Sequence, residues 1–175
     1  MSHQRLEKTL IIFKPDSVLR GIVGEILARF EKAGLKIVGI KMVKPDEGHY
    51  FHHYENIGKV ISRRGQKVFD NVLVMMMSGP VVVVALEGIE AVSLVRKMCG
   101  ATESKSALPG TIRGDYSHMS FDYCDDINIA IPNVIHASGD TTDAEQEIKH
   151  WFAETEMFDY ETVHEKFTQT KKKTY

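Results

Sequence analysis

Short apolar runs of strand length alternate along this chain with stripes of helical spacing, and this alternation limits the folds open to it. The runs lie at residues 8–14, 35–43 and 80–87, and the last is dominated by valine. Two stripes, at residues 23–30 and 91–98, repeat apolar side chains at i, i+3, i+4 and i+7, the spacing of an amphipathic helix. A single sheet covered by helices would bury all of these surfaces. We therefore expect an α/β or α+β fold.

The middle of the chain follows the same pattern less regularly. Residues 47–54 have short helical spacing, and residues 69–76 form a further helical stripe. Between them, residues 58–67 carry basic side chains and glycine with little apolar periodicity, which indicates a basic exposed loop.

The C-terminal third begins with residues 101–132, which are rich in glycine, proline, serine and aspartate. A segment of this length without secondary structure of its own is usually functional. A short strand is expected at residues 133–136. Thr142 and Glu145 then have the spacing of a capping box, which predicts a helix that buries Trp151.

Composition narrows the class of protein. The 175 residues suit one domain, in which residues 153–175 form a C-terminal extension with a basic, lysine-rich tail. The 22 Lys and Arg and the 24 Asp and Glu give a net charge of -2, which argues against nucleic-acid binding through bulk charge. The 2 cysteines form no Cys-x-x-Cys pair, so neither a disulfide framework nor a thiolate zinc site is indicated. No signal core or membrane-length apolar run is present, and we expect a soluble, cytoplasmic protein.

Phosphate binding, if present, must use side chains. The motifs G-x-x-x-x-G-K-[ST] and G-x-G-x-x-G are absent, which excludes a P-loop, a Rossmann fingerprint and a protein-kinase glycine loop. Lys14, Arg96, Thr102 and Arg113 stand at or near the ends of the expected elements, where donors for a polyphosphate could gather over a sheet. Taken singly, each is more typical of a solvated surface.

His136 is the foremost candidate for a catalytic group, because it ends a short strand and a neutral imidazole can act as nucleophile or base. Glu147 lies three residues after Ala144 and four before Trp151, on the inward stripe of the last helix, where a carboxylate needs a partner. A carboxylate that accepts the proton of one ring nitrogen fixes the tautomer and leaves the other nitrogen free to attack. A purely structural pair of the same residues is the competing interpretation.

Two further patterns are weaker. His49 and His53 have the i, i+4 spacing of metal ligands, but no acidic or cysteine ligand nearby in the sequence completes a zinc site, and a solvated helix face accounts for them better. Residues 113–115 spell an adhesion tripeptide, for which a cytosolic chain has no use.

In combination, several motifs resemble the nucleoside diphosphate kinase family over residues 8–152. They are KPD (14–16), RG-x-VGEI (20–26), HY (53–54), SGPVV (78–82), PGTIRGD (109–115) and NVIHAS (133–138). The resemblance implies a ferredoxin-like βαββαβ core, with a four-stranded antiparallel sheet covered by helices. It also implies transfer of the γ-phosphate of a nucleoside triphosphate to a nucleoside diphosphate through a phosphohistidine, with ping-pong kinetics.

The same resemblance implies roles for single residues. His136 takes the place of the phosphorylated histidine, Glu147 would hold its ring, and Tyr54 would lie beside it. The implied nucleotide-binding residues are Lys14 and Asn133 for the sugar hydroxyl and the transferred phosphate, His53 for the α-phosphate, and Arg96, Thr102 and Arg113 for the β- and γ-phosphates.

Partners and a cofactor follow from the resemblance as well. The substrates would be ATP, GTP, ADP and other nucleoside triphosphates and diphosphates. Mg²⁺ would bridge their phosphates, mostly through water, with no metal bound directly by the protein. The chain would form a homo-oligomer, a tetramer or a hexamer built from dimers.

The chain departs from the family in three places. The family has paired phenylalanines after the tyrosine, the first of which stacks on the base; this region is longer here and offers only Val68 and Phe69. The helical stripe that contains Phe69 favours a core position for this ring over a base platform. The segment between Arg113 and Asn133 is also longer. After the histidine, the usual Gly-Ser-Asp reads Ala-Ser-Gly, which should alter the turn only mildly.

Two other functions fit the sequence less well. A nucleic-acid-binding or scaffolding protein of the same fold could use Arg63, Arg64 and Lys67 with the lysine tail, although the intact phosphate-binding set argues against it. Another phosphohistidine transferase could act on a substrate that is not a nucleotide, although Lys14 and Asn133, the implied sugar contacts, argue against that.

Overall fold

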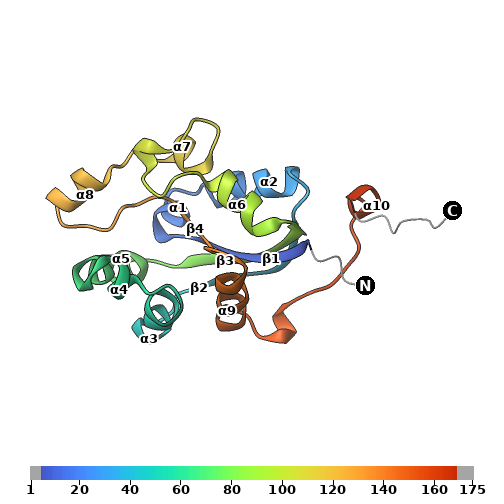
Figure 1. Cartoon of the computed structure of the whole chain (residues 1–175), viewed down its shortest axis with the longest axis horizontal. Helices are drawn as coiled ribbons and strands as arrows, with labels where there is room; N and C mark the ends of the chain where they lie inside the picture. The colour runs from blue at the N-terminus through green and yellow to red at the C-terminus, as the bar shows by residue number, and fades with distance from the viewer. Residues whose placement is uncertain (1–4, 169–175) are drawn as a thin grey trace.

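The computed structural model describes residues 5–168, which form a four-stranded antiparallel sheet with helices on both faces (Figure 1). The strands are β1 (Leu6–Phe13), β2 (Lys36–Val43), β3 (Val81–Ile89) and β4 (Ile135–Ala137), in the order β2-β3-β1-β4. With α2 (Val23–Lys32) and α6 (Ala91–Cys99) between them, the strands have the βαββαβ order. The expected ferredoxin-like core is therefore confirmed. The lysine-rich tail lies outside the described residues.

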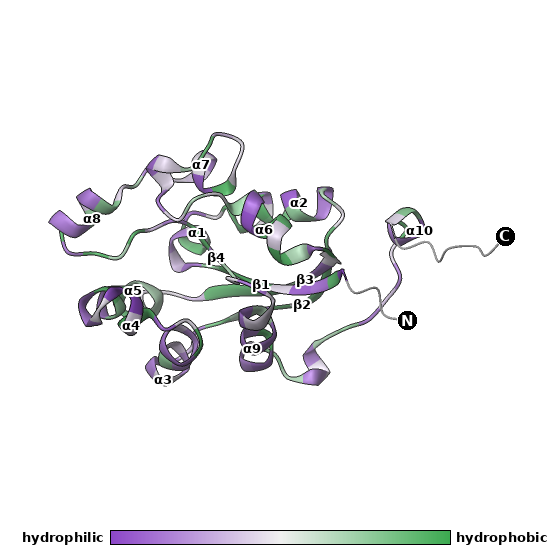
Figure 2. Cartoon of the chain, viewed as in Figure 1, coloured by the Kyte–Doolittle hydropathy of each residue, from purple (hydrophilic) through white to green (hydrophobic). Residues whose placement is uncertain are grey.

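β1 separates two hydrophobic clusters because its side chains alternate between the two faces of the sheet. Ile11 and Phe13 belong to the cluster under α2 and α6, whereas Leu10 and Ile12 belong to the cluster on the other face, and all four are fully buried. In Figure 2 the central strands are largely green and lie between two layers of helices. A strand buried on both faces is a continuous apolar run rather than an alternating one, as the sequence around β1 and β3 is.

Helices form a layer on each side of the sheet, with α1, α2, α6 and α7 on one side and α3, α4, α5 and α9 on the other (Figure 1). Among residues 5–168, no helix is long and apolar enough to cross a membrane. The remaining bounds are α1 (Pro15–Leu19), α3 (Glu47–Phe51), the π-helix η1 (His52–Ile57), α4 (Val60–Arg64), α5 (Gln66–Met77), η2 (Ser104–Ser106), α7 (Ile112–Tyr116), α8 (Phe121–Asp126), α9 (Thr141–Trp151), η3 (Glu154–Glu156) and α10 (Glu165–Thr168).

The expected loop at residues 58–67 is wrong, because α4 and the start of α5 occupy it. Val60 and Ile61 pack against the cluster that contains Leu10 and Ile12, and this tertiary contact stabilises a helix that the local pattern does not indicate. The long segment at residues 101–132 is likewise not free of structure, since η2, α7 and α8 lie within it.

Side chains that cap helices explain where these elements begin. The Thr111 and Ser120 hydroxyls accept hydrogen bonds from the amides three residues later and so open α7 and α8. The cap of α9 is Asp140, whose carboxylate accepts the Asp143 amide at 2.8 Å. The capping box expected at Thr142 is therefore wrong by two residues.

The described part of the C-terminal extension is held on the edge strand β2. The Phe158 amide donates to the Val38 carbonyl and the Tyr160 hydroxyl donates to the Ile37 carbonyl, each at 2.8 Å. Beside them, the buried Lys36 ammonium lies 3.1 to 3.3 Å from three carboxylates, those of Glu87, Asp159 and Glu165.

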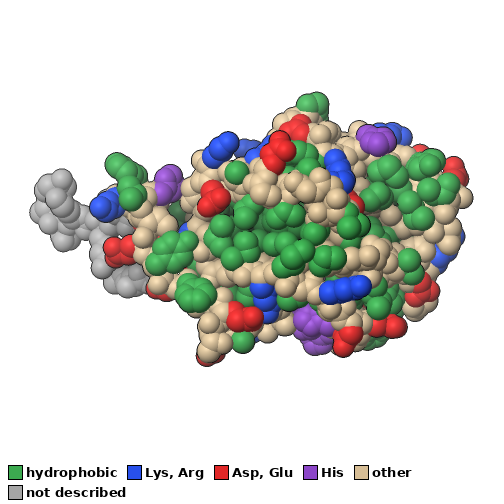
Figure 3. Space-filling model, turned by 180° about the vertical axis from the view of Figure 1, so that it is seen from behind, with side chains coloured by type: hydrophobic (Ala, Val, Ile, Leu, Met, Phe, Trp, Pro, Cys, Tyr) green, Lys and Arg blue, Asp and Glu red, His purple; other side chains and the backbone are tan. Residues whose placement is uncertain are grey.

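The same edge strand leaves apolar side chains in solvent. Ile40 and Met42 on β2 are 51% and 58% exposed. Seen from behind, hydrophobic side chains gather over the middle of the molecule (Figure 3).

Candidate active site

A cavity of about 870 Å³ collects nearly all of the expected site residues. Its lining comes from both helical layers and from the end of β4. Phe69 is the one expected site residue that is not part of this lining. The residues brought together are Lys14, His53, Tyr54, Val68, Arg96, Thr102, Arg113, Asn133, His136 and Glu147.

Local backbone geometry brings His136 to the cavity. β4 pairs only with β1, and His136 stands opposite Ile12 in that ladder. Just before the strand, Val134 has φ +63, a left-handed conformation that is rare for a β-branched residue. Its amide donates to an Asp16 carboxylate oxygen at 3.0 Å, and its carbonyl accepts the Lys14 amide at 3.0 Å and the Ser17 hydroxyl. The kink therefore ties the strand to the first turn of α1.

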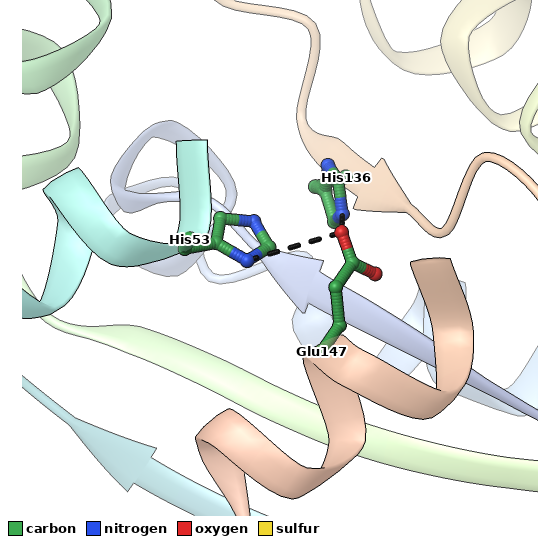
Figure 4. A group of neighbouring side chains, drawn as sticks. All are labelled: His53, His136 and Glu147. Carbon is green, nitrogen blue, oxygen red and sulfur yellow. Dashed lines mark hydrogen bonds and ion pairs between the residues drawn. The ribbon is translucent and has the colours of Figure 1, made fainter. Parts of the chain in front are cut away.

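Glu147 holds one nitrogen of the His136 ring (Figure 4). The distance from His136 Nε2 to Glu147 Oε1 is 2.8 Å, and the other carboxylate oxygen accepts the Ser138 hydroxyl at 2.6 Å. With a proton on Nε2 directed at the carboxylate, Nδ1 carries the lone pair. No hydrogen bond to Nδ1 is present among the described residues, and the ring is about one-fifth exposed, so this nitrogen is available to a ligand.

His53 packs against both His136 and Glu147 and is buried away from solvent. Its side chain is fully buried, with the Trp151 indole donating to Nδ1 at 3.1 Å and the His136 ring edge-on at 4.7 Å. Burial, and then the nearby His136, hold the pKa of His53 well below its usual range, so the ring is neutral. His53 also lines the cavity, and its Nε2 has no hydrogen-bond partner among the described residues. The contact with the α-phosphate that the family resemblance implies for His53 stays a prediction.

Tyr54 lies next to this group, with its ring centroid 6.3 Å from that of His136. Burial raises the pKa of the Tyr54 hydroxyl above its usual value, so the group is a neutral phenol. It can donate a hydrogen bond but cannot act as a base at neutral pH.

Cationic side chains also line the cavity that contains His136. The Lys14 ammonium donates to Asn133 Oδ1 at 2.6 Å, and the Asn133 amide donates in turn to the Thr102 carbonyl at 2.7 Å. Arg113 donates to the carbonyls of Gly100 and Ile135, both at 2.8 Å. Backbone carbonyls thus fix the guanidinium in place, which is what a preorganised phosphate site requires.

The charge on Lys14 is sensitive to pH. Burial, and then the repulsion of Arg113, lower the pKa of this lysine to about 8, against an opposing effect of Asp16. A bound phosphate would reverse that effect, because an anion favours the charged form.

Nitrogen and oxygen donors that could hold a metal also meet here. One ligand atom each from His53, His136 and Glu147 lie within 4.8 Å of one another. Two imidazoles and a carboxylate suit zinc, whereas Mg²⁺ prefers oxygen donors. Oxygen donors are supplied at the cavity by Asp140 and Asp143.

Val68 and Phe69 are separated by the structure. Val68 lines the cavity, whereas Phe69 is only 4% exposed and lies in the cluster with Leu10 and Ile12, edge-on to Phe51 at 5.6 Å. Sequence reasoning did not single out Phe121 and Ile129, which also line the cavity. Their apolar side chains in an otherwise polar segment were the available signal.

Comparison with known proteins decides the family. A family model described as "Nucleoside diphosphate kinase" matches residues 7–157. The chain belongs to the nucleoside diphosphate kinase family. A nucleoside diphosphate kinase of Borreliella burgdorferi is 44% identical over 155 residues, which cover 89% of this chain and 92% of that protein. One from Pyrococcus furiosus is 46% identical over 167 residues, 95% of this chain and 96% of that protein.

Solved structures of the family agree with the fold. The kinase from Borrelia burgdorferi, a transition state mimic with bound vanadate and ADP, has a TM-score of 0.92 at 41% identity and covers 95% of this chain and 99% of its own. A halophilic member from Halobacterium salinarum in complex with CDP has a TM-score of 0.78 at 34% identity, and covers 92% and 97%. This chain is accordingly a nucleotide-binding phosphotransferase that moves the γ-phosphate of a nucleoside triphosphate to a nucleoside diphosphate.

Proposed function

We propose that His136 is the residue that carries the phosphoryl group in this nucleoside diphosphate kinase. Nδ1 attacks the γ-phosphorus, an N–P bond forms, the bond to the β-phosphate oxygen breaks, and the nucleoside diphosphate leaves. A second diphosphate then takes the group by the reverse step. The observation that carries the assignment is the 2.8 Å contact of Nε2 with Glu147, which leaves the other nitrogen of the ring free to attack.

The remaining residues of the cavity would position charge rather than form bonds. Glu147 balances the positive charge that the ring gains on attack, and the buried Tyr54 hydroxyl lies beside the ring. Phosphoryl transfer depends chiefly on such positioning and on cations at the transferring group. The cations and polar groups assigned to the nucleotide are Lys14 and Asn133 for the sugar hydroxyl and the transferred phosphate, and Arg96, Thr102 and Arg113 for the β- and γ-phosphates. The vanadate and ADP in the Borrelia burgdorferi relative support a phosphoryl-transfer site of this kind.

Mg²⁺ suits this cavity as an ion that enters with the nucleotide. It would neutralise charge on the phosphates, and Asp140 and Asp143 offer oxygen acceptors for its water ligands. Burial, and then the negative charges of Asp140 and Glu147, raise the pKa of the Asp143 carboxyl, and a cation bound nearby would oppose this effect.

We further propose a cytoplasmic homo-oligomer, a tetramer or hexamer built from dimers. The edge position of β2 and its exposed Ile40 and Met42 support association through that strand. The nucleic-acid alternative loses much of its basis, because Arg63 and Arg64 line the nucleotide cavity rather than a separate surface.

Labelling with γ-³²P ATP tests the assignment. The wild-type chain should acquire an acid-labile, base-stable label within one turnover, and His136→Ala should acquire none. Glu147→Gln should label more slowly, because its neutral amide can accept the hydrogen bond from Nε2 but cannot balance the positive charge that the ring gains on attack. His118→Ala is the matched control, since this exposed histidine lies outside the cavity lining, and it should label at the wild-type rate. Labelling of His136→Ala at the wild-type rate would show that the nucleophile is misassigned.

A further inference from the structure

Two arms of the chain meet beside the cavity. One is the α4–α5 hairpin, and the other is the longer segment between Arg113 and Asn133 that contains α8; both lie at the same end of the molecule (Figure 1). The Arg64 guanidinium covers the Phe121 ring at 5.6 Å from its centroid. The Asn71 amide also lies 3.5 Å from the Asn128 side-chain oxygen. Each arm therefore touches the other through side chains.

Both arms supply apolar lining to the cavity. Val68 and Val72 come from α5, and Phe121 and Ile129 come from the longer segment. The cations assigned to the phosphates come from elsewhere in the fold, namely the end of β1, α6 and α7, although Arg63 and Arg64 of α4 also line the cavity. Phosphate-binding cations on one set of elements and apolar side chains on another suit a ligand with an anionic end and a flat aromatic end, as nucleotides have.

Burial restricts which aromatic side chains are available to stack on a base. Phe69 is enclosed in the core, and Val68 offers no π-face. Among the described residues that line the cavity, Phe121 is the only phenylalanine or tryptophan, and it is partly exposed. The Arg64 guanidinium already lies over this ring, so one face of Phe121 is within reach of another group.

Resting on the proposed function, we propose that Phe121 is the base platform of this enzyme. The nucleotide base stacks on the ring face that Arg64 covers here, and the guanidinium moves aside. The chain-specific segment thereby replaces the aromatic group that α5 lacks at position 68. Since every base has a π-face, the platform accepts purines and pyrimidines alike.

Calorimetric titrations of the full chain with ADP, GDP, CDP and inorganic tripolyphosphate test this. Phe121→Ala should weaken all three nucleoside diphosphates roughly ten-fold or more, the usual effect of losing one stacked base, and leave tripolyphosphate unchanged. Phe121→Tyr should restore affinity. Tyr123→Ala is the matched control on the same helix, because its side chain is 53% exposed and lies outside the cavity lining, and it should bind all four ligands normally.

Two results would overturn the proposal: unchanged nucleoside diphosphate affinity in Phe121→Ala, or an equal loss for tripolyphosphate. At saturating ATP the same variant should still label His136 completely. Failure of the wild-type chain to label would refute the catalytic assignment instead, and the difference between ADP and tripolyphosphate would still report on the platform. Phe121→Leu, which keeps apolar bulk without a ring, should behave as Phe121→Ala; wild-type affinity in this variant would also contradict stacking.

Discussion

The buried Lys14 shows how a single side chain can set the working range of the site. Its ammonium is desolvated and lies near Arg113, and both effects disfavour the charge. It keeps a hydrogen bond to Asn133, which is itself held by the Thr102 carbonyl. The group is therefore fixed in place while its charge is easily lost.

Nucleotide capture should weaken with rising pH because of this lysine. The pKa of Lys14 is lowered to about 8, so the cation is present below that pH and is lost as the pH rises through it. We expect kcat/KM, which reports the free enzyme, to fall above pH 8. Lys14→Arg keeps its charge at all these pH values, so its profile should be flat from pH 7 to 9 even if its absolute rate is lower. An identical decline in both proteins would exclude Lys14 as its source.

At the scale of elements, α5 divides its side chains between core and cavity. Consecutive residues on a helix point about 100° apart, so Phe69 turns into the core while Val68 faces the cavity. On the same side of the sheet, α3 packs against α9 through the stacked rings of His49 and His150, whose centroids lie 3.8 Å apart.

Phe69→Ala should therefore damage folding more than binding. Removing a buried phenylalanine costs about 3–5 kcal/mol of unfolding free energy, through lost burial and the cavity that remains. Urea unfolding should show this loss, and titration with ADP under native conditions should show near-normal affinity. Val68→Ala is the neighbouring control and should be much more stable than Phe69→Ala. Unaltered stability of Phe69→Ala combined with a large affinity loss for every base would make Phe69 the platform instead.

Some secondary-structure elements could be predicted from the sequence and others could not, and the difference has a physical reason. Strands and helices with a long apolar pattern, such as β1 and α2, were predicted close to their bounds, because burial enforces the periodicity. The helix α4 was missed, because it depends on contacts of Val60 and Ile61 with distant residues. Motifs identified the cavity residues, but the burial of His53 and the position of Phe121 follow from packing that no local pattern encodes.

At the scale of the whole molecule, a charged cluster joins the C-terminal segment to the sheet. Burial opposes the charge on Lys36, but hydrogen bonds to Asp159 and Glu87 and the further carboxylate of Glu165 raise the pKa of this lysine above its usual value. The Tyr160 ring also lies 5.0 Å from the ammonium. One side chain thus connects β2, β3 and residues 159–165.

Lys36→Met should loosen this connection without altering the cavity. Loss of hydrogen bonds to charged groups predicts a decrease of about 2 kcal/mol in unfolding free energy, measured with urea. Limited proteolysis should cut residues 153–168 sooner than in the wild type. Lys44→Met, an exposed lysine just after β2, is the control and should change neither quantity. Wild-type stability and cleavage in Lys36→Met would show that the hydrogen bonds of the Phe158 amide and the Tyr160 hydroxyl to β2 are enough to hold the segment.

The left-handed Val134 has a consequence for how this site can vary. A strained residue of this kind costs of order 1–3 kcal/mol, and glycine would adopt the conformation freely. Yet the valine side chain is fully buried, so glycine would exchange backbone strain for an empty space in the core. The two penalties are of similar size. Valine and glycine are therefore both compatible with the left-handed backbone at position 134. The direction of the backbone entering β4, rather than the identity of this side chain, is what places His136 at the cavity.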